Sequence, residues 1–413
     1  METLQRLKMI GELETSTPGV KRSAIVYKHM RDPALLKYYY RMKTLSLMES
    51  NQLSGSSPTD LFIGRYNYPK VFVGPLLPPE FGDTSILSTP ERWRYLDIEK
   101  IVEMRSKLVR GMHVSNVYDV EKGRLEEQIR DLAIAERPAE AEVKFDKKPF
   151  VKIAINDEVE PFGPSAVLKD FSIYNVKSDK KIESRYYDDA ATATTSLKEL
   201  YERGVPVSKL QRAFSAGIFG LKSNRKFVPT RWSITAVDDT LSKANLSTVK
   251  EEEPIDSIHV FYNSALDNRW LIFFFPGYWQ YESIEVWYPR TIWNDGSEVS
   301  IYSSYEGYRG RKTYAEIGGC YYAARLAVTE KLQEMKKQAM VLILRETHEG
   351  YVMPVGVWNV REHVRQTLNT KPDVLEDLSQ VFDYIKRKLA IPPKEWVRNS
   401  TLLRDLLMQK RLF

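Results

Sequence analysis

The chain has 413 residues, of which 43% are hydrophobic and 28% charged, so it can build a large core in one extended domain or in two. Its 61 basic and 55 acidic residues give a net charge of +6, which permits nucleic-acid binding through a local patch but does not demonstrate it. One cysteine, five scattered histidines and no long apolar run exclude internal disulfides, and predict a cytoplasmic protein with no metal site, no cofactor and no membrane span.

The first part of the chain predicts helix, then short strands, then helix again. Residues 1–57 are expected to form a basic, tyrosine-rich helical segment ending in a Ser- and Gly-rich loop at 51–59. Short strands follow at 60–77. Asp97 is predicted to cap a helix whose apolar residues recur until Gly111. Arg105 lies on the apolar side of that helix, where it either extends its charge to water or is a paired structural or ligand-binding arginine. A second helix is predicted at 121–136.

A strand at 150–155 and two short helices at 196–215 precede the most polar segment, Arg225–Asp239. Its basic residues Arg225, Lys226 and Arg231 are candidate nucleic-acid contacts. Its adjacent carboxylates, Asp238 and Asp239, are typical either of divalent-ion ligands or of a cap on a helix that begins at Thr240. In the first case they form, with Arg231 and Glu316, the catalytic group of an enzyme acting on nucleic acid or a nucleotide.

The second half predicts a mixed sheet. Strands are expected at 258–262, 270–275, 284–288 and 340–344, and helices at 313–336 and 375–389. Four tryptophans in 268–293 indicate either a sheet core or a surface on which bases stack. Because helices and strands mix without a regular βαβ alternation, we predict an α+β fold, a mixed sheet core with surrounding helices. Its two parts, 58–250 and 251–398, form one domain or two.

The segment 305–314 interleaves tyrosines with Arg309, Arg311 and Lys312 around glycines. Phosphates can meet the three cations while bases stack on tyrosine, which makes these residues candidate nucleic-acid contacts. The alternative is a solvated loop that leads into the following helix.

The chain finishes in a short tail, 399–413. Its residues Gln409, Leu412 and Phe413 are similar to a peptide that binds sliding clamps of the PCNA kind, in which the amide fills a polar notch and the apolar pair fills a pocket. The pattern lacks the further aromatics of the full motif. A terminal helix packed on the core is the alternative.

Several segments carry a family resemblance: 64–71 with 73–75, 90–93 with 105–111, 225–239, 317–325 and 354–358. Together they resemble the archaeal Nre family of DNA repair proteins. The resemblance implies a role in repairing DNA damage and a clamp-binding peptide at Gln409, Leu412 and Phe413. It implies no zinc, because the family's N-terminal zinc finger is built on cysteines and the one cysteine here is Cys320. It supplies no reaction.

The expected function is therefore a DNA repair factor that binds the sliding clamp PCNA through its tail and contacts DNA through basic and aromatic loops. The enzyme described above is the alternative.

Overall fold

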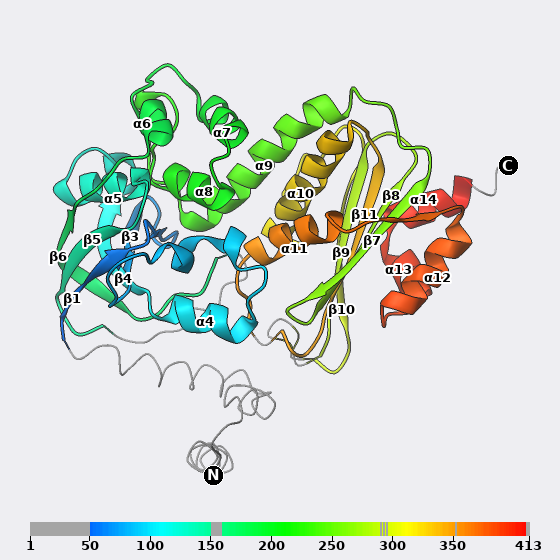
Figure 1. Ribbon diagram of the computed structural model, residues 1–413, viewed down its shortest axis with the longest axis horizontal. Coiled ribbons are helices and arrows are strands. Elements are labelled where there is room, and N and C mark those ends of the chain that lie inside the picture. The colour runs from blue at the N-terminus through cyan, green and yellow to red at the C-terminus, as the bar shows by residue number, and fades with distance from the viewer. Residues whose placement is uncertain are drawn as a thin grey trace, which may run out of the picture.

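The computed structural model describes residues 50–149, 159–289, 291, 294, 296–351 and 353–409. This part of the chain contains two six-stranded mixed sheets with helices around and between them (Figure 1), which confirms the predicted α+β fold. The predicted strand at 150–155 and all but the end of the predicted N-terminal helical segment lie outside the described residues.

The first sheet has the strand order β1-β5-β6-β4-β3-β2 and is antiparallel except for the pairing of β4 with β6. Its strands are β1 (Gln52–Ser57), β2 (Leu61–Ile63), β3 (Lys70–Leu77), β4 (Val109–Asn116), β5 (Ala139–Phe145) and β6 (Ser165–Tyr174). The loop predicted at 51–59 is wrong, because β1 pairs with β5 there. Its small residues are needed for packing: a Cβ on Gly55 would lie 2.1 Å from the carbonyl oxygen of Pro78.

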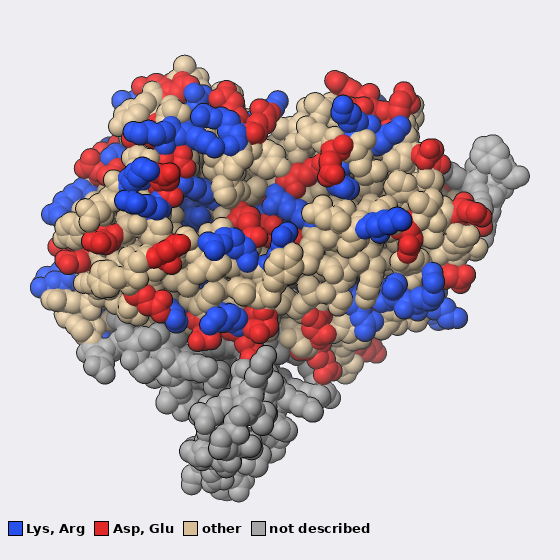
Figure 2. All heavy atoms as spheres, viewed as in Figure 1, with Lys and Arg blue, Asp and Glu red and all other residues tan. Residues whose placement is uncertain are grey.

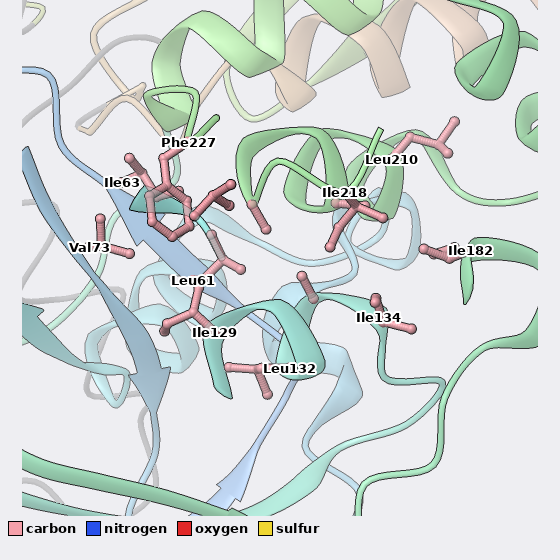
Figure 3. Close-up of a cluster of buried hydrophobic side chains, with 14 of the residues drawn as sticks. Leu61, Ile63, Val73, Ile129, Leu132, Ile134, Ile182, Leu210, Ile218 and Phe227 are labelled. Atoms are coloured by element: carbon pink, nitrogen blue, oxygen red, sulfur yellow. The ribbon is translucent and has the colours of Figure 1, made fainter. Parts of the chain in front are cut away.

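Helices cover this sheet and close its core. They are α5 (Arg124–Ile134), α6 (Lys180–Tyr186), α7 (Ala193–Glu202) and α8 (Val207–Ser215). The helix α4 (Ile98–Ser106) packs in a separate cluster with Leu76 of β3 and with Trp287 and Trp358. Figure 3 shows side chains from β2, β3, α5 and α8 pointing toward one another, with Phe227 beside Ile63.

The α4 predictions are confirmed in part. Asp97 caps α4 by accepting a hydrogen bond from the Lys100 backbone N–H at 2.7 Å. The helix ends at Ser106, short of the predicted Gly111, because β4 begins at Val109. Arg105 does not extend to water: it is buried and pairs with Asp60 at 2.6 Å.

The second sheet has the order β10-β9-β11-β8-β7-β12, with β11 antiparallel to β8 and parallel to β9. Its strands are β7 (Ile258–Ala265), β8 (Asn268–Phe275), β9 (Gln280–Trp287), β10 (Ser300–Glu306), β11 (Met340–Thr347) and β12 (Asp373–Leu375). Both faces are covered by helices (Figure 1). The residues of β8 are therefore apolar without alternation. Trp270 and Trp279 are buried in the core between this sheet and α10, and Trp287 is buried in a neighbouring cluster, as the core interpretation predicted. Trp293 lies outside the described residues.

Two sets of helices form these covers. On one face lie α10 (Gly319–Met335) and α11 (Trp358–Leu368), with α9 (Thr230–Val249) packed across α10. On the other face lie α12 (Leu378–Lys388), α13 (Pro393–Asn399) and α14 (Thr401–Gln409). Leu402 and Leu403 of α14 are buried, so the first part of the predicted tail belongs to the fold. Residues 410–413, and with them Leu412 and Phe413, lie outside the described residues.

The 20-residue helix α9 joins the two halves. Val237 and Leu241 pack in the core of the first sheet, while Leu246 and Val249 pack in the core of the second. The loop that follows is tied down, since the Gln338 backbone N–H donates to the Glu253 carbonyl at 3.1 Å. The division predicted between residues 250 and 251 thus falls at the end of α9.

Candidate nucleic-acid interface

The three carboxylates predicted as a catalytic group do not lie together. α9 begins at Thr230, so Asp238 lies inside the helix, and the cap on a helix starting at Thr240 is wrong. Asp238 is fully buried and accepts hydrogen bonds from Arg361 Nη1 at 3.0 Å and from Gln211 Nε2 at 3.1 Å. Burial raises the pKa of Asp238 to about 6, against the opposing effect of Arg361. This carboxylate is half of an internal ion pair.

Asp239 and Glu316 face two other arginines. Asp239 accepts a short hydrogen bond from Arg325 Nη2 and pairs with Lys243 Nζ at 2.8 Å. Glu316 pairs with Arg311 Nη2 at 2.8 Å, and this partner lowers the pKa of the Glu316 carboxyl to about 2. Across the described residues, no group of three or more His, Cys, Asp or Glu side chains is arranged to hold a metal ion. The candidate enzyme group therefore has no common geometry, because its acids lie in separate ion pairs.

The exposed side of α9 carries aromatic and basic side chains instead. The 18 positions from Trp232 to Lys250 make five helical turns, so the two residues lie on one side of the helix, about 27 Å apart. Lys243 lies on that side too. Tyr314, from the loop before α10, reaches it with its hydroxyl 3.4 Å from Thr235 Oγ1. We call the surface formed by Trp232, Lys243, Lys250 and the flanking Tyr68, Tyr308 and Tyr314 the α9 strip.

The loop between β10 and α10 forms the far end of the α9 strip. Tyr308 is 47% exposed and meets Tyr278, which is 67% exposed, edge to face at 6.4 Å between ring centroids. Lys250 Nζ donates to the Tyr308 carbonyl at 2.6 Å and lies 4.8 Å from the centroid of its ring. Arg309 and Lys312 are exposed in the same loop. Three cations and two open rings thus lie in this part of the surface, the combination that base stacking and phosphate binding require.

Arg311, the third candidate in this loop, is turned inward. Its Nη1 donates to the Tyr305 carbonyl at 2.8 Å, its Nη2 pairs with Glu316, and its side chain is 11% exposed. This arginine fixes the shape of the loop, and of the three candidates here only Arg309 and Lys312 are exposed.

Trp232 marks the near end of the α9 strip. Its ring is 44% exposed and lies 5.4 Å from the ring of Tyr68, which is also partly exposed. Burial and the hydroxyl of Tyr118 raise the pKa of Tyr68, so these two phenols are neighbours. Lys226 Nζ lies 5.7 Å from the ring centroid of the exposed Tyr118. Sequence-separated segments therefore build a second aromatic and basic group here.

The two remaining candidates of the Arg225–Asp239 segment differ in position. Arg225 is buried, donates to the Gly220 carbonyl at 3.0 Å, and lies 4.9 Å from the ring centroid of Tyr186. It holds the local fold together. Arg231 lies in the first turn of α9, at the wall of a cavity described below.

The charge pattern limits how a nucleic acid can be held. On the face shown in Figure 2, basic and acidic side chains are interspersed over both halves of the molecule. Binding to that face must therefore depend on local contacts, because no broad positive field covers it. None of the helices in the described residues is both long enough and apolar enough to cross a membrane.

Sequence reasoning missed most of the α9 strip. The helical spacing that places Trp232, Lys243 and Lys250 on one side of α9 is a whole number of turns. This spacing is not recognised in the sequence when the helix is predicted to start at Thr240. Tyr278 comes from the β8–β9 connection, and its meeting with Tyr308 has no sequence signal.

Comparison with known proteins gives two family matches and three curated relatives. Residues 29–294 match the family described as "Archaeal Nre, N-terminal", and residues 306–413 match "Archaeal Nre, C-terminal". The DNA repair protein NreB of Archaeoglobus fulgidus is 39% identical over 351 residues, covering 85% of this chain and 88% of the relative. The DNA repair protein NreA of Haloferax volcanii is 33% identical over 371 residues (87% and 88%), and NreA of A. fulgidus is 33% identical over 364 residues (88% and 90%). No solved structure matches.

Proposed function

Because the chain belongs to the archaeal Nre family, we propose that it is a DNA repair protein that holds a DNA strand along the α9 strip and binds a sliding clamp through its last residues. The relatives named as DNA repair proteins support the general role. The α9 strip is the observation that carries DNA contact.

The chemistry of the α9 strip suits a strand with unpaired bases. Trp232 at one end and Tyr308 at the other are open rings on which bases stack, at about 1–3 kcal/mol per base. Arg309 and Lys312 are exposed cations in the Tyr308 loop that can neutralise phosphates, and Lys243, midway along the strip, is exposed and paired with Asp239. The length of about 27 Å corresponds to about eight nucleotides at 3.4 Å each.

Charge removal tests the strip. Arg309→Gln with Lys312→Gln is expected to reduce the slope of log K against log salt for single-stranded DNA by about 1.4, since each phosphate contact contributes about 0.7. The matched control removes two exposed lysines remote from α9, Lys371→Gln with Lys386→Gln. Equal slopes for the two variants in a fluorescence-anisotropy titration would refute the strip as the DNA site.

Ring removal tests stacking separately. Trp232→Ala is expected to weaken single-stranded DNA binding about 10- to 100-fold while leaving the salt slope unchanged, because the ring carries no charge. Unchanged affinity would contradict a stacking role for this end of the strip.

The clamp proposal rests on the tail. α14 is anchored by the buried Leu402 and Leu403 and ends at Gln409, whose side chain, like residues 410–413, lies outside the described residues. In the proposed complex, Gln409 fills the polar notch of the clamp while Leu412 and Phe413 fill its apolar pocket, at roughly 1.5–3 kcal/mol for each apolar side chain.

The tail test is a double substitution. Leu412→Ala with Phe413→Ala is expected to weaken binding to a recombinant archaeal sliding clamp at least about 100-fold in calorimetry. Lys410→Ala is the control and is expected to change little. Retained affinity in the double variant would exclude the tail as the clamp ligand.

A further inference from the structure

A cavity of about 200 Å³ lies beside the first turn of α9. Its walls come from β2, β3, β4, the loop ending at Phe162, and the start of α9. This volume is below the range of about 300–1,000 Å³ that is typical of sites for drug-sized ligands. The cavity can therefore take at most one nucleotide-sized ligand, with part of it at the side lined by Arg65 and Tyr66.

Arg110 of β4 lies in this wall, and no acidic side chain in the described part of the chain pairs with it. Its guanidinium carbon is 4.1 Å from the ring centroid of Phe62 and 5.6 Å from that of Phe162. Its Nε is buried and has no hydrogen-bond partner, and no carboxylate of the described residues pairs with it. Burial lowers the pKa of Arg110 to about 10, so the side chain still carries its charge at neutral pH.

Among the described residues, the arginines that are buried are paired. Arg105 meets Asp60 at 2.6 Å, and Arg361 meets Asp238 at 3.0 Å. Arg110 is partly exposed with a buried Nε, so its guanidinium, unpaired among the described residues, can meet an anion that enters the cavity.

The surroundings specify the anion further. Phe62, Phe72 and Phe162 line the cavity with aromatic rings, as a planar group requires. The first turn of α9 borders the cavity, and the N-terminal end of a helix favours negative charge. Glu160 also lines the cavity, and burial raises the pKa of its carboxyl. This side chain can hydrogen-bond the edge of a base, as an acceptor when ionised or as a donor when protonated.

The rim of the cavity continues into the α9 strip. Arg65 lies over the ring of the exposed Tyr66, with 5.5 Å between its guanidinium carbon and the ring centroid, and both residues line the opening. Arg231 lines the cavity and is followed directly by Trp232, the first ring of the strip.

We propose that this cavity binds one nucleoside monophosphate unit, with its phosphate on Arg110 and its base against the phenylalanine wall beside Glu160. The unit comes from one of two sources: a free mononucleotide, or a nucleotide turned out of a DNA strand that lies along the α9 strip. The second source rests on the proposed function, and the first does not.

The first arm of the test uses free ligands on the full chain. Each deoxynucleoside monophosphate, the matching nucleosides and inorganic phosphate are titrated by calorimetry. A monophosphate is expected to bind at least tenfold more tightly than its nucleoside or than phosphate alone. Arg110→Gln is expected to weaken monophosphate binding about 10- to 100-fold, the usual effect of losing a hydrogen bond to a charged group. Arg110→Lys keeps the charge but not the planar guanidinium, so its affinity for a monophosphate is expected to lie between those of the wild type and Arg110→Gln.

The second arm uses DNA. Duplexes that differ in one unpaired nucleotide are compared for wild type, Arg110→Gln and Trp232→Ala. Arg110→Gln is expected to remove only the preference for the unpaired nucleotide, whereas Trp232→Ala weakens binding to both duplexes. Preference for the unpaired nucleotide without mononucleotide binding identifies DNA as the source.

The outcomes separate the two proposals. The cavity proposal is overturned if Arg110→Gln, shown to be folded by its thermal melting, keeps wild-type affinity for mononucleotides and wild-type preference in DNA. Phosphate binding as tightly as any mononucleotide also overturns it, as does the absence of both mononucleotide binding and DNA preference. Weak DNA binding with intact mononucleotide binding would instead count against the α9 strip alone.

Discussion

Glu282 of β9 holds the C-terminal helix in place, and its substitution gives a sharp test of the fold around the tail. This carboxylate is fully buried, and its two oxygens accept hydrogen bonds from the backbone N–H groups of Thr401 at 2.8 Å and Leu402 at 3.0 Å. The Ser400 hydroxyl donates to it at 2.5 Å. A negative charge therefore lies at the N-terminal end of α14, where the helix dipole favours it.

Glu282→Gln keeps the shape of the side chain but replaces one of its two hydrogen-bond acceptors with a donor. Whichever way the amide is oriented, its NH2 group faces a backbone N–H, which leaves a buried donor unpaired at about 1–3 kcal/mol. Loss of the charge at the helix end removes about 1 kcal/mol more. Burial of Leu402 and Leu403 contributes about 1.5–3 kcal/mol each to docking, so a loss of about 2–4 kcal/mol is comparable to what holds α14.

Hydrogen-exchange mass spectrometry measures this loss directly. Peptides covering residues 402–408 are expected to exchange roughly 30- to 1,000-fold faster in Glu282→Gln, while β8 and β11 keep their protection. Glu334→Gln, at an exposed position of α10, is the control. Clamp affinity is expected to stay unchanged, because residues 409–413 are intact. Unchanged exchange at 402–408 would refute the anchoring role, and faster exchange across the whole second sheet would refute its local character.

Three further outcomes are expected. Arg361→Met leaves the buried Asp238 without its partner and is expected to lower the urea-unfolding free energy by about 3–5 kcal/mol. The double variant with Asp238→Leu is expected to recover most of that free energy, and a double variant as unstable as the single one would contradict the reasoning. The Glu316 carboxyl is expected to titrate near pH 2 in carbon NMR and to return toward 4.5 in Arg311→Gln. Because its folded pKa is lowered, its contribution to stability is present above about pH 4.5 and lost as the pH falls toward 2; an ordinary pKa in the wild type would exclude the pair. Gly74→Ala places a Cβ 2.1 Å from a carbonyl oxygen of β4 and is expected to destabilise the first sheet by about 1–3 kcal/mol or more. A variant that melts at the wild-type temperature would contradict the close approach of β3 and β4.

Much of the fold was predictable because local patterns agree with the tertiary structure. The apolar run at 270–275 became β8 because helices cover both faces of its sheet. Asp97 caps α4 as its sequence position indicates. β1 was not predictable, because its serines and Gly55 are selected by close backbone packing and not by β propensity.

The sites were less predictable, because they depend on partners far away in the sequence. Asp238 and Asp239 are adjacent, yet their partners are Arg361 and Arg325, and nothing local distinguishes such pairing from metal binding. Arg110 stood at the end of a predicted helix. Its contact with Phe62, and the fact that no acid of the described residues pairs with it, are visible only once the strands of the first sheet are assembled.

The strand order of the second sheet affects how the protein is made on the ribosome. β8 and β9 follow one another in the chain but do not pair, since β11 lies between them. Translation from Phe275 to Met340 takes roughly 3–13 s at about 5–20 residues per second. For those seconds the nascent polypeptide has an unpaired strand edge flanked by aromatic side chains, so its yield in a cell depends on what shields that edge until the missing strand emerges.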